Sequence, residues 1–523
     1  MTASTTTFNF NINTAEQFHE SFNETDPTRM YMFVGRVTSF ANDAAPTTVA
    51  NTPYNSTYDV FRDMVTLKRI NYTDTTHVCQ RYNWTNNTIY TQYTDTNPNL
   101  FSSQFYVITS DYNVYKCIDN NRGSPSTEEP AGVGTSLINT SDGYRWKFMF
   151  NVSSSDALKF LNSTYIPVVQ ITANNGSAQW AVQQAAANGS IDHMVISANG
   201  NGYLSLANTF SAITNSTVVR LNSEASSIDG IYNNSTVFIS SGLGSGQLRR
   251  ITRYIGITKS AVVNGAFTIT PNTQSTYYIG PNVIIMGDSG ATSAQRATAY
   301  VSNCVGGQVR KITMISTGRN YSTANVTIRA NTSYGSGAIV SPALSPQGGH
   351  GSSAVNELNA KSIMISVSLG DGDANTYPAN NDLRMVGLIR NPKLRSGAAA
   401  NVAIIDQTSR IVLTGVTGDF REDEVVVGST SGSKARVVQF ANTNSIRTQG
   451  ILKVVRVTTG GTGLAFSQGE TLTADTTGVV GTVSSFAKPA VREGTGQVLY
   501  IENKTPITRT SDQIEDFRFV VTF

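Results

Sequence analysis

Short motifs in this chain contain the residue types that catalysis requires. Gly-Asp-Ser-Gly at 287–290 places a serine in a glycine turn, where a serine can act as a nucleophile. Acyl transfer by serine needs a histidine base that is oriented by a buried carboxylate. The histidines that precede the motif, His19, His77 and His193, lack the flanking sequence of such a base. The pattern therefore favours a tight turn between strands, and not the nucleophile of a hydrolase. Loss of an activity in a Ser289→Ala variant would instead indicate a hydrolase.

Two further motifs have the composition of ligand-binding loops. Gly-x-Gly-x-Gly at 242–246 has phosphate-loop spacing. Nucleotide-binding glycines lie between a strand and a helix, whereas both flanks here are strand-like and no Gly-Lys-Ser/Thr follows. Asp-Gly-Asp at 371–373 offers two carboxylates without the further oxygen ligands of a calcium loop. Both motifs are typical of turns, and neither predicts a cofactor.

Histidine and cysteine are too scattered to predict a metal centre. His77 and Cys79 form a His-x-Cys pair with no second pair near it, and the chain contains 4 histidines in 523 residues. Zinc sites need three or four such ligands. We interpret His350 as a loop residue, and Trp84 and Trp146 as core aromatic residues. The sequence therefore predicts no enzyme, no cofactor and no metal site.

The composition is that of a β-rich protein. Charged residues make up 14% of the chain, against about 25% in a typical soluble domain. Ser, Thr, Asn and Gly replace them, which favours turns and short strands over helices. The net charge of +3 is too balanced to predict nucleic acid or an anionic membrane as the main partner. No apolar run approaches the roughly 18 residues of a membrane span.

The cysteines and the N-terminus bear on the compartment. Cys79, Cys117 and Cys304 are an odd number and widely spaced, which favours free thiols in a reducing cytoplasm. Residues 1–7 are polar and contain no apolar core of a signal peptide. We therefore expect a cytoplasmic site of synthesis and no membrane partner.

Two strands, residues 114–119 and 144–150, are predicted to lie at the centre of the core. The second strand alternates between an aromatic face and a basic face, which predicts a half-buried strand. The aromatic face consists of Tyr144, Trp146, Phe148 and Phe150, and the other face of Arg145, Lys147 and Met149. We predict that the aromatic face is core and that Arg145 and Lys147 are candidate interface residues. Charge reversal at both should then weaken assembly without unfolding the chain.

Hydrophobic periodicity predicts the remaining elements. Helices are expected at 15–22, with Thr14 as a possible N-cap, and at 58–70, where apolar residues have helical spacing. The apolar C-terminal segment is expected to complete a sheet begun earlier in the chain. Strands are predicted at 30–36, 105–108, 114–118, 361–369, 385–392 and 517–523.

Two regions repeat internally. Residues 189–203 match 307–321 at an offset of 118 residues, within a Gly/Ser/Asn-rich region from about 173 to 347. A second repeat has an offset of 46 residues, and its units are too small to bury a core alone, so the two copies are predicted to pack together. In it, Phe420, Glu424, Thr430, Gly432, Val437 and Phe440 match Phe466, Glu470, Thr476, Gly478, Val483 and Phe486.

Outside the repeats, the order of several segments resembles a phage protein family. The family is the baseplate wedge subunit of contractile-tailed bacteriophages, the dimeric subunit called gene product eight. The resemblance covers roughly 10–172, 355–395 and 488–523, about half of the chain. It rests on residues 32–36, 54–70, 114–119, 142–150, 383–392 and 500–507, Asp512-Gln513, and the terminal 519–523. The resemblance implies a β-sandwich with a few short helices, a homodimer that joins neighbouring wedge proteins, and no active site.

We therefore expect a mainly β fold, with a β-sandwich core, a few short helices and two inserted β-rich repeat modules. The expected function is that of a structural virion protein of the tail baseplate, assembled in the host cytoplasm, which forms a homodimer and binds other baseplate wedge proteins. No nucleic acid and no membrane is expected as a partner. The alternative is a receptor- or carbohydrate-binding phage tail protein, of a kind that is usually trimeric. The predicted domains are the wedge core at 1–172, 348–397 and 488–523, and the insertions at 173–347 and 398–487.

Overall fold

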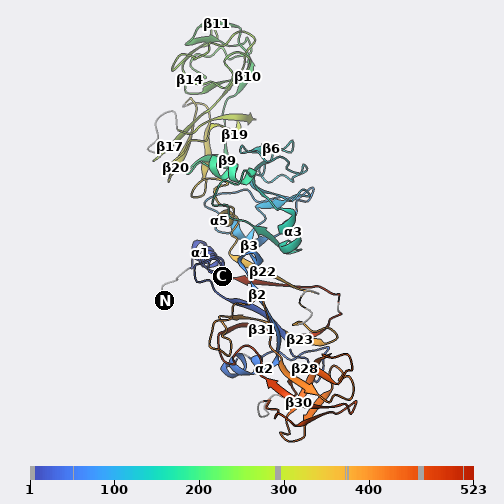
Figure 1. The fold of residues 1–523 in the computed structure, drawn as a ribbon. Helices are drawn as coiled ribbons and strands as arrows, with labels where there is room; N and C mark the ends of the chain where they lie inside the picture. Colours follow the sequence, from blue (N-terminus) through green and yellow to red (C-terminus); the bar gives the residue numbers. More distant parts are fainter. Residues whose placement is uncertain are drawn as a thin grey trace, which may run out of the picture. The chain divides into compact units, whose positions relative to one another are not determined.

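The computed structural model describes residues 6–523 except 51, 289–295, 332, 371–372, 374–375, 458–463 and 511, and except the side chains of 55 and 56. Strands hold 43% of the residues and helices 10%, which confirms the mainly β fold (Figure 1). The chain forms two compact units. Unit 1 consists of Met1–Val78, Leu158–Leu161 and Lys361–Phe523, and unit 2 of Cys79–Ala157 and Asn162–Ala360. The sequence-based division into a wedge core and two insertions stays a prediction.

Unit 1 contains the predicted β-sandwich. One sheet has the order β24-β2-β1-β23-β31, and in the other β32 and β22 are followed by β3. Met32 and Val34 of β1 share one apolar core with Ile365 and Val367 of β22, so the two sheets pack face to face. The strands are β1 (Met30–Gly35), β2 (Met64–Ile70), β3 (Thr75–Gln80), β22 (Ser362–Leu369), β23 (Asp382–Arg390), β24 (Ile404–Asp406), β31 (Gln497–Thr508) and β32 (Glu515–Thr522).

The strand predictions in unit 1 are confirmed. β1, β22 and β23 lie where the apolar runs predicted them, and all six residues of β1 are buried. The C-terminal strand β32 pairs antiparallel with β22 along its whole length, from Ser362 opposite Thr522 to Leu369 opposite Glu515. The C-terminus therefore completes a sheet begun earlier, as predicted.

The helix predicted at 58–70 is wrong over its second half. Only η1 (Asn55–Asp59) and α2 (Val60–Asp63) are helical, and residues 64–70 form β2. β2 hydrogen-bonds to β1 on one side and to β24 on the other, and Val65 and Leu67 are buried on its two faces. Pairing on both edges outweighs the helical spacing of the side chains.

The first helix starts earlier than predicted. α1 (Phe8–Glu20) begins after Thr7, whose hydroxyl accepts a hydrogen bond from the Phe10 N–H. Thr14 lies inside the helix, where its hydroxyl donates to the Phe10 carbonyl at 2.8 Å. The predicted N-cap, Thr14, therefore lies about two turns after the observed one. The true start is hard to recognise in the sequence because the first turn of the helix lacks acidic residues.

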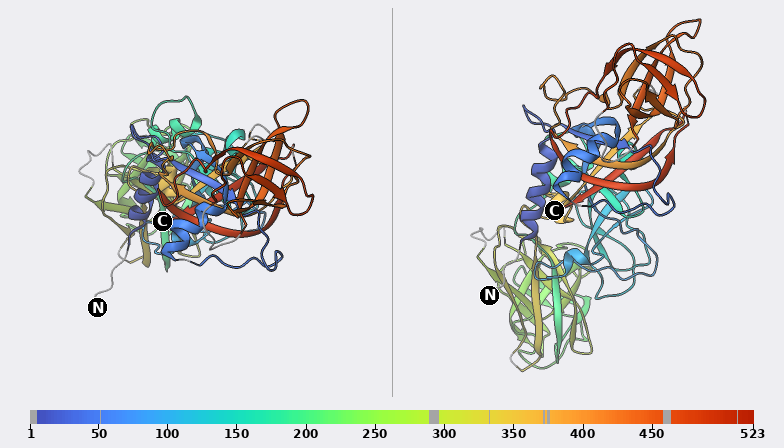
Figure 2. Two further views of the ribbon diagram at one scale, coloured as in Figure 1. Left: turned by 60° about the horizontal axis from the view of Figure 1, so that its bottom comes forward. Right: turned by 90° about the horizontal axis from the view of Figure 1, so that it is seen from below.

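The 46-residue repeat forms a closed six-stranded barrel in unit 1 (Figure 2, orange to red). Both copies contribute to one core, including Phe420 and Phe466, so the prediction that they pack together is confirmed. The barrel order is β25-β28-β27-β26-β29-β30. Its strands are β25 (Ser409–Thr414), β26 (Val425–Gly428), β27 (Lys434–Asn442), β28 (Gln449–Arg456), β29 (Thr471–Ala474) and β30 (Val480–Ala487).

The two copies exchange hydrogen bonds through one equivalent glutamate each. The Glu470 carboxylate accepts from the backbone N–H groups of Thr430 (3.1 Å) and Ser431 (2.9 Å) in the turn of the first copy. The Glu424 carboxylate accepts from the N–H (3.3 Å) and hydroxyl (2.8 Å) of Thr477 in the turn of the second copy. The repeat thus builds a pseudo-two-fold barrel in which each copy closes the other.

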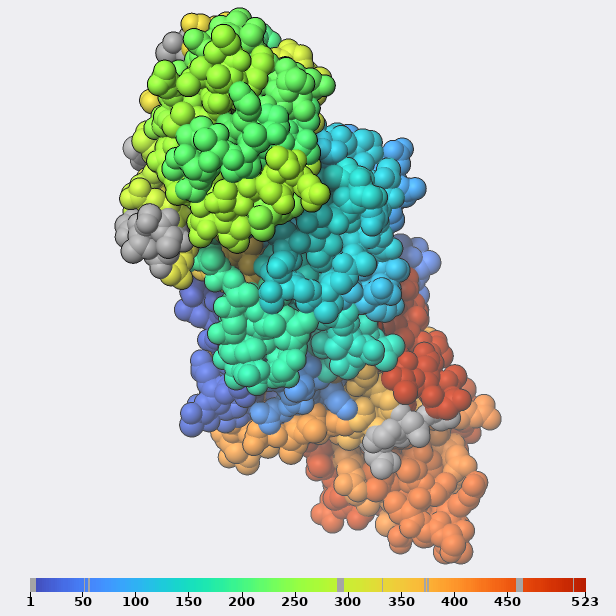
Figure 3. All heavy atoms as spheres, turned by 90° about the horizontal axis from the view of Figure 1, so that it is seen from above, coloured from blue at the N-terminus to red at the C-terminus, as the bar shows by residue number. Residues whose placement is uncertain are grey.

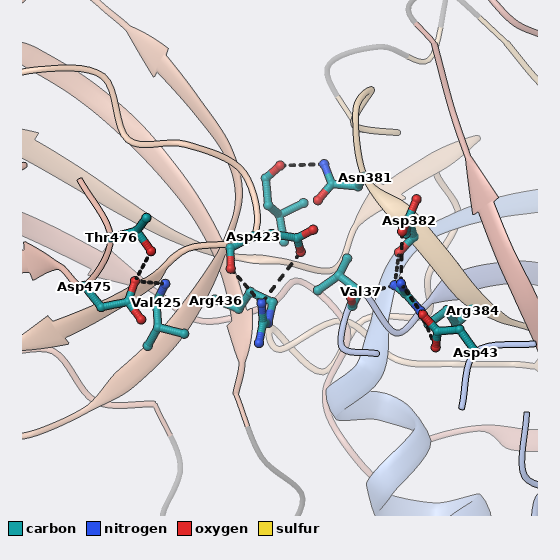
Figure 4. A network of polar contacts seen from close by, with 11 residues as sticks. Val37, Asp43, Asn381, Asp382, Arg384, Asp423, Val425, Arg436, Asp475 and Thr476 are labelled. Atoms are coloured by element: carbon teal, nitrogen blue, oxygen red, sulfur yellow. Dashed lines mark hydrogen bonds and ion pairs between the residues drawn. The ribbon is translucent and has the colours of Figure 1, made fainter. Parts of the chain in front are cut away.

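The barrel is attached to the sandwich by polar and apolar contacts (Figure 4). The Asn381 side chain, just before β23, donates to the Val438 carbonyl of β27 at 2.7 Å. Val438 also belongs to the sandwich core. Nearby, the buried Arg384 guanidinium binds Asp43 at 2.8 Å and Asp382 at 2.9 Å. The inserted barrel is therefore continuous with the core of unit 1.

Unit 2 is centred on the sheet β4-β5-β7-β6. The predicted hairpin and central strand pair are confirmed, and Tyr144, Trp146 and Phe148 are fully buried in one aromatic core. The strands are β4 (Tyr106–Ile108), β5 (Asn113–Asp119), β6 (Ile138–Asn139) and β7 (Arg145–Asn151).

The half-buried character predicted for residues 144–150 is wrong, because β7 is buried on both faces. Lys147 and Met149, on the face opposite the aromatic residues, are 6% and 1% exposed. Helix α4 (Ala178–Ala185) packs on β7, and the space around Gly351 is filled by Val182 of this helix and by the Lys147 stem. These covering segments lie far from β7 in the sequence, so the alternation within residues 144–150 could not predict that they cover its second face.

The first insertion contains a seven-stranded sheet, β10-β16-β13-β14-β15-β12-β11, with its own core. Its residues are coloured green in the space-filling view (Figure 3). Residues 242–246 are a turn between β13 and β14, in which Gly242, Gly244 and Gly246 all have positive φ. This confirms a glycine turn. The strands are β10 (Leu206–Thr209), β11 (Ala212–Asn215), β12 (Val218–Arg220), β13 (Thr236–Ser241), β14 (Leu248–Ile255), β15 (Ser260–Val263) and β16 (Thr276–Gly280).

The 118-residue repeat has reciprocal contacts in unit 2. The Tyr203 N–H donates to the Gly307 carbonyl at 2.9 Å, and the Tyr321 N–H donates to the Gly189 carbonyl at 3.1 Å. Each copy therefore binds the glycine of the other. The first copy contains β9 (Ile191–Asn201) and the second contains β19 (Gln308–Ser316). The other strands of this region are β17 (Asn282–Gly287), β18 (Thr298–Val305), β20 (Ala324–Arg329) and β21 (Ser336–Leu344). The other elements are η2 (Tyr72–Asp74), η3 (Leu100–Ser102), α3 (Ser154–Phe160), β8 (Tyr165–Val168) and α5 (Ala354–Glu357).

Candidate functional site

A groove of about 970 Å³ lies between the edge strands of the two sandwich sheets in unit 1. In the described part of the chain, β31 pairs only with β23, and β32 only with β22. Each strand therefore presents a row of backbone N–H and C=O groups that no strand of its own chain occupies. Such free edges are the usual sites of strand addition.

The groove is lined mainly by apolar side chains. At its rim, Leu499 and Tyr500 of β31 are 44% and 41% exposed. Tyr500 also makes an edge contact with Phe519 of β32, with ring centroids 5.8 Å apart. The apolar lining includes Phe18, Met30, Val386, Leu388, Phe517, Phe519 and Val521. The groove thus exposes the partly buried Phe18, Phe517, Phe519 and Val521, which pack against the sandwich core.

The two edges differ in regularity. The pairing of β31 shifts register between Leu383 and Met385 of its neighbour, and Pro506 in this region lacks a backbone N–H. β32 pairs without a register shift over eight residues. The regular edge of β32 is therefore the better one for an added strand.

The candidate interface residues Arg145 and Lys147 both bind groups inside unit 2. The Arg145 guanidinium donates to the Asp192 carbonyl at 2.9 Å. The Lys147 ammonium donates to the Thr135 carbonyl at 2.6 Å. Lys147 does not lie on the surface of unit 2.

Lys147 borders a buried charge cluster that sequence reasoning missed. Lys116 of β5 contacts Glu357 of α5, and these side chains are 0% and 2% exposed. The imidazole of His350 lies 3.9 Å from the Glu357 carboxylate through Nδ1 and 3.9 Å from the Asp192 carboxylate through Nε2. The members are up to 241 residues apart in sequence, so no local pattern could join them.

Burial and charge act against each other in this cluster. Burial alone would raise the pKa of Glu357, but the Lys116 charge and His350 hold this pKa at about 2. Burial lowers the pKa of Lys116, while Glu357 opposes the shift. The pair is therefore held in direct contact in an environment of low dielectric constant.

The remaining sequence motifs are structural where the chain is described. The Asp288 carboxylate accepts from the N–H groups of Ser322 (3.0 Å) and Thr323 (2.9 Å), so it fastens a turn. Ser289 lies outside the described residues, and so do Asp371 and Gly372. Asp373 forms an ion pair with Lys68 at 3.0 Å. Among the described residues, no group of three or more His, Cys, Asp or Glu side chains could hold a metal ion.

A second groove, in unit 2, is polar. It has a volume of about 750 Å³. Its lining includes Arg250, Arg329, Asn234, Asn282 and Asn331 but no Asp or Glu. Guanidinium and amide groups without a nearby carboxylate can bind an anionic ligand that carries hydroxyl groups.

Comparison with known proteins adds no assignment: no family model matches the chain, and no curated protein matches it. Within the described residues, none of the helices has the length and apolar character that a membrane crossing requires.

Proposed function

We propose that this chain is a structural virion protein of a phage tail baseplate, a wedge subunit that forms a homodimer and links neighbouring wedge proteins. The proposal starts from the ordered segments that resemble this family. Three of them, 383–392, 500–507 and 519–523, fall on β23, β31 and β32. The proposal assigns the chain no enzymatic activity.

The observation that carries the proposal is the groove between the free edges of β31 and β32. It combines an apolar lining with unpaired backbone groups, which together suit a persistent protein contact. A two-fold axis beside such an edge would place the same strand of two copies side by side. Other surfaces then remain for different wedge proteins.

Co-assembly tests the linking role. The purified chain is mixed with the other wedge proteins of the same phage, and complexes are separated by size and weighed by native mass spectrometry. The proposal predicts a complex that contains two copies of this chain. A chain that elutes apart from every wedge protein would contradict it.

The polar groove in unit 2 favours the alternative, a receptor- or carbohydrate-binding tail protein. Its two arginines, Arg250 and Arg329, suit a saccharide that carries carboxylates. Calorimetric titration with an oligogalacturonate and with its neutral methyl ester tests this alternative. Binding of the acid alone, lost in Arg250→Ala/Arg329→Ala but kept in the control Arg253→Ala, would support it, and absence of binding would exclude this ligand class.

A further inference from the structure

Lys116 and Glu357 bring an amine and a carboxyl group into direct contact inside unit 2. Both side chains are almost fully shielded from solvent. They come from β5 and α5, 241 residues apart in sequence. Groups held in reacting geometry can have effective molarities of about 10⁵–10⁸ M. We propose that Lys116 and Glu357 form an isopeptide bond between Nζ and Cδ, with loss of one water molecule; this inference is independent of the proposed function.

The surroundings of Lys116 suit an amide better than an ammonium ion. An ammonium group has three N–H donors. Among the described residues, the only hydrogen-bond acceptor for the Lys116 ammonium is Glu357. Its other close neighbour is the Tyr93 ring, whose centroid lies 4.9 Å from Nζ. A secondary amide has a single N–H and no charge, so the bond removes two unsatisfied donors and a buried ion pair.

The second oxygen of Glu357 is held by backbone donors. Oε1 accepts from the Gly351 N–H at 2.7 Å and from the Ser353 N–H at 3.3 Å. Attack of the amine on Cδ places negative charge on this oxygen in the tetrahedral intermediate. Two backbone N–H groups already aimed at the oxygen stabilise that charge without rearrangement.

The proton transfers balance within the pair. The Lys116 ammonium gives one proton to Oε2 and the resulting amine attacks Cδ. The nitrogen then loses a second proton, the Cδ–Oε2 bond breaks, and this oxygen leaves as water with both protons. His350, whose Nδ1 has no hydrogen-bond partner among the described residues, lies 3.9 Å from Oε2 and can carry the second proton. No oxidant, reductant or other reactant is needed.

The bond would have a structural consequence. A cross-link between 116 and 357 closes a covalent loop that contains the whole insertion at 173–347. The central sheet and the segment that returns from the insertion could then separate only by breaking a covalent bond. Such a link suits a chain that must carry load.

The mass of the intact full-length chain tests the bond. The protein is denatured and weighed, and the expected mass is that of the sequence less one water. Proteolysis should then release one branched peptide that joins Lys116 to Glu357. A wild-type mass equal to the sequence mass overturns the proposal, whatever the variants do.

Two lysine variants provide the matched comparison. Lys116→Met removes the nucleophile and should restore the full mass of its sequence. Lys147→Met changes the neighbouring buried lysine, which lies on β7 and is not part of the bond, and should keep the loss of water. A loss of water that persists in Lys116→Met would assign the change to another site and contradict the proposal. If Lys116→Met does not fold, the branched peptide of the wild-type chain still decides.

Discussion

Glu470 shows how one carboxylate can close the inserted barrel. It is buried and accepts hydrogen bonds from Thr430, Ser431 and Ser467. The equivalent Glu424 serves the opposite turn, so the two residues relate the repeat copies. Both glutamates are matched positions of the repeat in the sequence. The sequence did not show that each glutamate binds the turn of the other copy.

Removing this carboxylate should weaken the barrel. We expect Glu470→Ala to lower the free energy of unfolding by about 1–3 kcal/mol, because the N–H groups of Thr430, Ser431 and Ser467 lose a charged acceptor. Chemical denaturation followed by fluorescence measures the change. The control is Glu422→Ala, an exposed glutamate of the same barrel, which should be neutral. Equal stability of the two variants would contradict the role of Glu470.

The Glu470 carboxylate should also make the stability of the fold depend on pH. Burial alone would raise the pKa of Glu470, but hydrogen bonds from Ser431, Ser467 and Thr430 outweigh it and lower this pKa. A lowered folded-state pKa stabilises the fold above the unfolded value of about 4.3, and this contribution is lost as pH falls through the folded-state value. Wild type should therefore lose more stability than Glu470→Gln when the pH is lowered from about 5 to 3. Parallel denaturation curves for the two proteins across this range would refute it.

Lys147 is a residue whose setting changes its expected role. Its ammonium is buried near Asp192 and Glu357. Lys147→Glu would place a second negative charge beside Asp192, and we expect a loss of roughly 3–5 kcal/mol of unfolding free energy. For Lys147 we therefore expect a less stable fold, in place of the weakened assembly with an intact fold that the sequence suggested. Thermal unfolding of Lys147→Glu distinguishes the two, since an unchanged midpoint would contradict burial of the charge.

At the scale of elements, close strand packing depends on single small residues. Gly387 of β23 lies against β1 and β31, where an added Cβ would fall 2.2 Å from Cζ of Phe33 and 2.4 Å from the Tyr500 carbonyl oxygen. We expect Gly387→Ala to destabilise the sandwich by about 3 kcal/mol through overpacking. Gly265→Ala, at a position with nothing within 4 Å of the added Cβ, is the control in the same denaturation measurement. Equal midpoints for the two variants would contradict the close packing of β1, β23 and β31.

Local patterns predicted those elements whose own sequences have the apolar run or the alternation of a strand. The buried runs of β1, β22 and β23 and the alternation of β7 gave strands at the observed positions. The helix prediction for residues 64–70 was wrong because pairing with β1 and β24 decides their conformation. β24 lies more than 330 positions away in the sequence. The prediction that the second face of β7 is exposed was wrong for the same reason, since the residues that cover this face come from 178–185 and near 351.

The candidate site was less predictable than the fold. The groove exists because β31 and β32 end their sheets, a fact about strand order that no single segment contains. The charge cluster joins Lys116, Asp192, and the neighbouring residues His350 and Glu357 from three distant segments. Only a repeat, such as the 46-residue one, carries tertiary information in the sequence itself, because it requires two similar units to find each other.

At the scale of the whole molecule, the proposed dimer depends on the groove as a contact between two copies. Leu499 is exposed at its rim, so Leu499→Asp should weaken the dimer about tenfold or more without unfolding the chain. Ile446→Asp is the matched control, because Ile446 is an exposed apolar residue of the barrel, 74% exposed and outside the groove.

The most direct test is the mass of the native chain in solution, measured by light scattering after size separation for wild type, Leu499→Asp and Ile446→Asp. We expect a dimer for wild type and for Ile446→Asp, and a monomer for Leu499→Asp at the same concentration. A dimer that survives Leu499→Asp would place the contact elsewhere. A wild-type monomer or trimer would contradict the proposed wedge subunit itself.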